Sequence, residues 1–137
     1  MRRVIVVLLA MLSVAFSAPS WACGVCLEDK IAATYDHAVV TRAGARHHLV
    51  VFGEMKGAVD MTALVGKVAL AAARVRGIDL GTVRTSASPP AFSFALDPGA
   101  RSPESAVAEV QRRLRTQGAT LSILRVMSGD ATTTARN

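Results

Sequence analysis

The order of strand-like and helix-like patterns between residues 48 and 127 is the feature that most restricts the fold of this 137-residue chain. Four short segments are rich in β-branched and aromatic residues, which is typical of strands, and they cover residues 48–54, 78–85, 91–96 and 119–127. Two segments between them, at 60–76 and 102–117, carry apolar residues at helical spacing. The expected element order is therefore β-α-β-β-α-β.

Residues at the ends of these segments support the two helices. Asp60 and Ser102 are good N-terminal capping residues, and Gly77 stands where a C-terminal glycine is common. The order β-α-β-β-α-β is that of ferredoxin-like domains, in which two right-handed crossovers place both helices on one face of an antiparallel sheet. We expect an α+β fold with a ferredoxin-like domain at residues 47–127, followed by a flexible tail at 128–137.

One more helix is expected before this domain, at residues 26–40, inside a segment that spans residues 23–46. Its apolar residues fall on one face of a helix and are Leu27, Ile31, Tyr35, Ala38 and Val39. Such a helix could cover part of the sheet face that the other two helices leave open. The alternative is that the open sheet face binds a partner protein or forms a homodimer.

Part of the chain resembles a heavy-metal-associated domain. The resemblance rests on residues 49–55 (Leu-Val-Val-Phe-Gly-Glu-Met), a helix to Arg76 and the Gly-Ile-Asp-Leu that follows, and it covers residues 48–127. It implies the ferredoxin-like fold and the carriage of soft metals such as copper(I) between two loop cysteines. The corresponding loop here, residues 53–61, contains methionine but no cysteine, so the resemblance assigns no metal ligand to it.

Residues 1–22 have the three parts of a secretory signal peptide. A basic start is followed by an apolar run over 4–15 and by small residues up to Ala22, where we expect cleavage. The run is short for a transmembrane helix. We therefore expect an exported protein, periplasmic or secreted, that begins at Cys23. A retained membrane anchor is one alternative, and a lipid on Cys23 that attaches the protein to a membrane is another.

Cys23 and Cys26 are the two cysteines of the chain and form a Cys-x-x-Cys motif. Two thiolates at this spacing can hold one soft metal ion, and copper(I) suits them because its coordination number is low. The pair could instead exchange thiols and disulfides, or form a structural disulfide in a non-catalytic interaction module. Redox activity is disfavoured because no strand precedes the motif and Glu28 and Asp29 oppose a thiolate. Metal binding is our first interpretation.

Four other residues could add a ligand to this motif. Met55 is the best further soft ligand. His37 is eleven residues from Cys26, about 16 Å along a continuous helix, which is too far to share an ion. His47 and His48 begin a strand, where neighbouring side chains point to opposite faces, so at most one of them would join a site.

Composition argues against nucleic-acid binding, and the lack of familiar catalytic motifs argues against an enzyme. The formal charge of +6 falls to +4 without the leader, and only 4% of residues are aromatic, so nucleic-acid binding is not expected. The one basic cluster, at Arg112, Arg113 and Arg115, suits the end of a solvated helix. No Gly-x-Ser-x-Gly, His-Glu-x-x-His or phosphate-loop motif is present, so the sequence offers little support for an enzyme.

Overall fold

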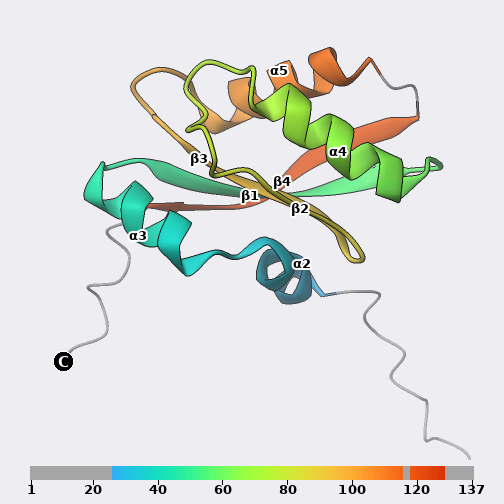
Figure 1. Cartoon of the computed structure of the whole chain (residues 1–137), viewed down its shortest axis with the longest axis horizontal. Coiled ribbons are helices and arrows are strands. Elements are labelled where there is room, and N and C mark those ends of the chain that lie inside the picture. Colours follow the sequence, from blue (N-terminus) through green and yellow to red (C-terminus); the bar gives the residue numbers. More distant parts are fainter. Residues whose placement is uncertain (1–25, 116–117, 129–137) are drawn as a thin grey trace, which may run out of the picture.

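The structure, a computed structural model, describes residues 26–115 and 118–128, which form three layers (Figure 1). The elements are α2 (Leu27–Thr34), α3 (His37–Ala45), β1 (Leu49–Gly57), α4 (Met61–Ala72), β2 (Arg84–Ala87), β3 (Pro90–Leu96), α5 (Pro103–Leu114) and β4 (Ala119–Ser128). A four-stranded antiparallel sheet lies between the layer of α4 and α5 and the layer of α2 and α3. The fold is α+β, as expected. The expected signal peptide, Cys23 and all of the expected tail except Ser128 lie outside the described residues.

Strand β1 is central in the sheet, whose strand order is β2-β3-β1-β4. Its residue Val51 lies opposite Phe94 of β3 and opposite Val126 of β4. Neighbouring residues on a strand point to opposite faces, yet Val50, Val51 and Phe52 are each at most 1% exposed. Both faces of β1 are therefore covered.

Helices α4 and α5 pack on the same face of the sheet. Leu64 and Val68 of α4 belong to one buried cluster with Phe92 and Phe94 of β3, whose rings are stacked with centroids 6.0 Å apart. These phenylalanines therefore face this helix. Gly53 of β1 makes room for the Phe92 ring, because a Cβ at Gly53 would lie 2.1 Å from its Cζ atom.

The expected strand at 78–85 is mostly a loop. A single isolated bridge joins Ile78 to Leu96, and β2 begins only at Arg84. The hydroxyl of Thr82 donates to the Asp79 carbonyl at 2.7 Å and accepts from the Ala95 amide at 3.0 Å, which closes the loop against β3. Side-chain hydrogen bonds of this kind compete with strand pairing, so the apolar pattern alone misplaced the strand.

The expected helix at 26–40 is also wrong in detail, because it is two helices. Tyr35 has extended backbone angles, and Asp36 starts α3 by accepting hydrogen bonds from the amides of Ala38 (2.9 Å) and Val39 (3.2 Å). The break lets the Tyr35 ring stack on Phe52, with centroids 6.4 Å apart. Together α2 and α3 bury the second face of β1 and β3. This is the sheet face for which binding of a partner protein or a homodimer was the alternative expectation.

Within residues 26–115 and 118–128, no helix combines the length and the apolar character that a membrane span requires.

Candidate dithiol site at the start of helix α2

Cys26 is the N-cap residue of α2 and is partly exposed. Its backbone N–H donates to a carboxylate oxygen of Asp29 at 3.3 Å, and the two residues form a capping box. The side chain of Cys26 belongs to neither of the two buried apolar clusters. The structure thus places this half of the motif at a surface helix start, while Cys23 lies outside the described residues.

Helix α2 crosses the strands of the sheet rather than running along them. Three contacts each join it to a different strand: Glu28 to Arg125 of β4 at 2.8 Å, Lys30 to Glu54 of β1 at 2.5 Å, and the Thr34 carbonyl to the Ser93 hydroxyl of β3 at 2.8 Å. Because β1 lies between β3 and β4, the helix runs from the β4 side towards β3. Cys26 therefore lies on the β4 side of the sheet.

The contact with Glu54 fixes the middle of α2. Glu54 is only 6% exposed, and its second oxygen lies 2.6 Å from the Lys56 ammonium group. Burial by itself would raise the pKa of Glu54, but the hydrogen bonds from Lys30 and Lys56 outweigh it and hold the pKa below its ordinary value. Glu54 is thus a carboxylate at neutral pH, bound by two ammonium groups.

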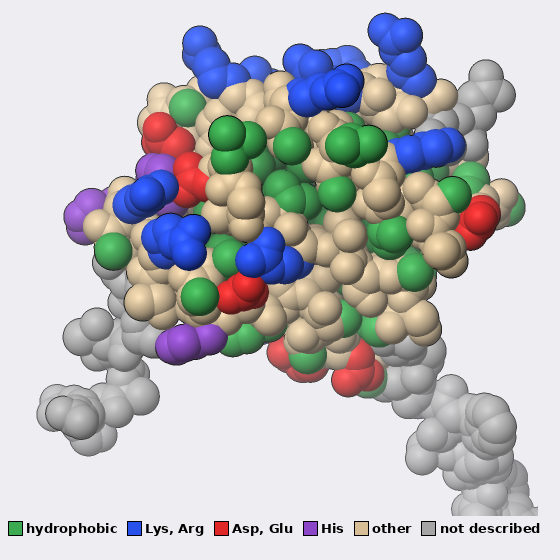
Figure 2. All heavy atoms as spheres, in the orientation of Figure 1, with side chains coloured by type: hydrophobic (Ala, Val, Ile, Leu, Met, Phe, Trp, Pro, Cys, Tyr) green, Lys and Arg blue, Asp and Glu red, His purple; other side chains and the backbone are tan. Residues whose placement is uncertain are grey.

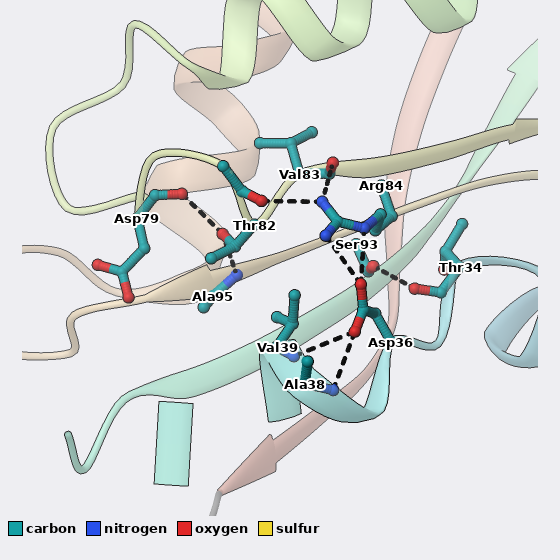
Figure 3. A network of polar contacts seen from close by, with 11 residues as sticks. Thr34, Asp36, Ala38, Val39, Asp79, Thr82, Val83, Arg84, Ser93 and Ala95 are labelled. Atoms are coloured by element: carbon teal, nitrogen blue, oxygen red, sulfur yellow. Dashed lines mark hydrogen bonds and ion pairs between the residues drawn. The ribbon is translucent and has the colours of Figure 1, made fainter. Parts of the chain in front are cut away.

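A polar network fixes the end of α2 and the start of α3 (Figure 3). Asp36 accepts from the Arg84 guanidinium of β2, with oxygen–nitrogen distances of 2.8 and 3.0 Å. The hydrogen bond from Arg84 lowers the pKa of Asp36 below its ordinary value. Arg84 also donates to the carbonyls of Gly81 (2.9 Å) and Val83 (3.0 Å). Polar contacts consequently tie the α2–α3 layer to the sheet from Glu28 of α2 to Asp36 at the start of α3.

Two acidic residues near Cys26 each have a partner of their own. Glu28 is paired with Arg125, a partner that is 97 residues away in the chain. Asp29 is engaged with the backbone of Cys26. The Asp29 carboxylate keeps its negative charge beside Cys26 and disfavours a thiolate there, whereas the N-terminal end of the helix favours one.

The structure does not bring Met55 to this motif. Met55 is 2% exposed and packs in the buried cluster beneath α4 and α5. Cys26 lies on α2, on the other face of the sheet.

The histidines also lie in separate places. His37 is exposed at the first position of α3, beyond the break in the helix. The Nδ1 atom of His48 lies 2.8 Å from an oxygen of Asp79, and His47 is exposed. In the part of the chain that the structure describes, no three His, Cys, Asp or Glu side chains are grouped as metal ligands.

One surface feature was missed by the sequence analysis. A groove of about 650 Å³ lies between α4 and α5, and five basic residues line it: Lys67, Arg74, Arg112, Arg113 and Arg115. We call it the basic groove. From the sequence, its three α5-side arginines were expected at a solvated helix end. The available signal was the seven-residue spacing of Lys67 on α4 and Arg74, which follows two residues after the end of that helix.

The described residues thus present one cysteine of the motif at the start of a helix that three strands hold in place. Comparison with known proteins adds no family: no family model matches the chain, and no curated protein matches it.

Proposed function

We propose that this chain is an exported protein that binds a soft metal ion, copper(I) in particular, through the thiolates of Cys23 and Cys26. The observation that carries the proposal is the position of Cys26, partly exposed at the fixed start of α2 and outside both cores. Two soft thiolate donors match the softness and low coordination number of copper(I). A tetrahedral zinc site would need two more ligands.

The proposed scaffold is ferredoxin-like. In its support, β1, α4, β2, β3, α5 and β4 follow one another in the β-α-β-β-α-β order, with α4 and α5 in one buried cluster. The strand order β2-β3-β1-β4 puts the first and third strands of this unit at the centre of the sheet. Heavy-metal-associated domains carry their cysteines after the first strand, whereas this chain would carry them on an added N-terminal helix.

A copper(I) competition assay tests the metal proposal. The purified, reduced protein should remove about one copper(I) per chain from a chromogenic chelator. Replacing both Cys23 and Cys26 with Ser should abolish this transfer. The matched controls Met55→Leu and His37→Ala should leave it unchanged, because Met55 is in the core and His37 lies beyond the helix break. Full copper affinity in the double Ser variant would refute the proposal.

Thiol–disulfide exchange is the second candidate, because a cysteine at a helix N-terminus is a favourable place for a thiolate. It predicts a disulfide that equilibrates readily with glutathione and a reductase activity lost in the double Ser variant. A purely structural disulfide would instead resist reduction, and its loss would lower the melting temperature alone.

Export is tested separately by the intact mass of the protein recovered from outside the cytoplasm. Cleavage after Ala22 gives a chain that begins at Cys23. A chain that begins at Met1 would contradict the proposal, and an added lipid mass would establish the lipid-anchored alternative.

A further inference from the structure

The basic groove carries a positive charge that the described residues leave largely uncompensated. Its lining includes one acidic residue, Glu109, so the net charge of the lining is +4. Glu109 is already shared by Arg112 and Arg113, and these contacts lower its pKa. Among the described residues, Lys67, Arg74 and Arg115 form no ion pair. Figure 2 shows Lys and Arg side chains gathered over α4 and α5.

The same groove exposes an apolar side chain. Leu70 of α4 is 66% exposed and lines the groove together with Ala71 and Leu114, which are almost fully buried. Burying a leucine side chain contributes about 1.5–3 kcal/mol. The groove therefore combines an apolar contact with surrounding positive charge.

We propose that the basic groove binds an acidic amphipathic helix of another protein. The apolar side of that helix packs on Leu70, and its carboxylates face Lys67 and Arg74. Two roughly antiparallel helices leave a channel along which a third helix can pack, which is the common helix-in-groove mode of recognition. The outward residues of α4 next to the groove, Ala63 and Gly66, are small and exposed and allow a close approach of the partner.

A second copy of this chain is a poorer occupant. Pairing two basic grooves would bring two surfaces of charge +4 together, and like charges facing each other across an interface oppose binding. An anionic bilayer is also poorer, because Leu70 is the one large exposed apolar residue of the groove. Stable attachment to a bilayer needs more inserted apolar surface than this.

The test uses a fluorescent synthetic peptide of about 21 residues, three heptads of Glu, Ala and Leu in amphipathic order. A scrambled peptide of the same composition is its control. We expect the amphipathic peptide to bind the purified protein, with fluorescence anisotropy falling as salt is added. Amide chemical shifts in a two-dimensional NMR spectrum should change in α4 and α5.

Three variants locate the binding. Arg74→Glu and Leu70→Ser should each weaken binding, the first by about tenfold or more. The matched control is Arg42→Glu, because Arg42 is exposed on α3 in the opposite layer. The affinity of this variant for the amphipathic peptide should stay within about twofold of that of the unchanged protein. Thermal melts check that all three variants remain folded.

Four outcomes would overturn the proposal. The first is equal binding of the scrambled peptide, which would mean attraction by charge alone. The second is an equal effect of Arg42→Glu and Arg74→Glu, and the third is a set of shift changes outside α4 and α5. The fourth is binding to phosphatidylglycerol vesicles that Arg74→Glu abolishes, without any binding of the peptide, which would identify a membrane surface instead.

Discussion

The ammonium group of Lys30 on α2 lies 2.5 Å from a carboxylate oxygen of Glu54 on β1, and both side chains are largely shielded from water. Removing one member of such a pair leaves the other charge poorly compensated in a buried place. Lys30→Met should therefore lower the free energy of unfolding by about 2 kcal/mol, measured by urea denaturation; the loss is moderated because Lys56 remains. Lys67→Met, an exposed residue on α4, is the control and should change little. Equal stability of the two variants would show that the pair does not anchor α2.

The lowered pKa of Glu54 predicts how stability depends on pH. A carboxylate whose pKa is lower in the folded chain stabilises the fold above its ordinary pKa of 4.5. That contribution is lost as the pH falls from 4.5 through the lowered value, because the unfolded chain then binds the proton more readily. Glu54→Gln should be less stable at neutral pH and should lose less further stability on acidification than the unchanged protein. Asp36 and Glu109, whose pKa values are also lowered, act equally in both proteins. An equal loss of unfolding free energy on acidification in Glu54→Gln and the unchanged protein would contradict the prediction.

Phe94 tests the core beneath α4 and α5. It is 1% exposed in the middle of β3, so Phe94→Ala should leave a cavity and cost about 3–4 kcal/mol of stability. Leu80→Ala is the control, because Leu80 is 76% exposed and its truncation opens no cavity. Thermal melts compare the two, and an unchanged melting temperature for Phe94→Ala would mean that β3 does not bury this face.

Two glycines should respond in opposite directions to the same change. A Cβ at Gly66 on the outer side of α4 would meet nothing within 4 Å, so Gly66→Ala should stabilise the protein by up to about 1 kcal/mol through helix propensity. A Cβ at Gly53 would collide with the Phe92 ring, so Gly53→Ala should destabilise the protein. Chemical denaturation of both variants measures the difference. A change in the free energy of unfolding that has the same sign in both variants would contradict this account of the two glycine sites.

Local patterns in the sequence predicted the parts of the fold that depend on local physics. The caps at Asp60 and Ser102 begin α4 and α5 as expected, since a capping side chain acts on amides only two or three residues away. The strand expected at 91–96 is found as β3, because the preference of aromatic side chains for strands is also largely a local property.

Contacts between distant residues account for most of what the sequence did not predict. Asp36 starts α3 by a local cap that the surrounding apolar stripe obscured, and Arg84, 48 positions later, holds the capping carboxylate in place. Thr82 keeps the first part of the expected strand in a loop by accepting a hydrogen bond from the Ala95 amide. The basic groove forms between two helices that were expected on one face of the sheet, but the element order does not show which of their side chains meet. Met55 appeared as a soft ligand because its side chain is chemically suited, while its burial depends on strand alternation.

The crossing of α2 over three strands has a consequence for the order of assembly. The chain is synthesised from its N-terminus, so Cys26 and Glu28 are made well before Arg125, which pairs with Glu28 from 97 residues further along. The contact between Glu28 and Arg125 can therefore form only after β4 has been made. The start of α2, where Cys26 stands, acquires this link to the sheet later in synthesis than the contacts that Lys30 and Thr34 make with β1 and β3.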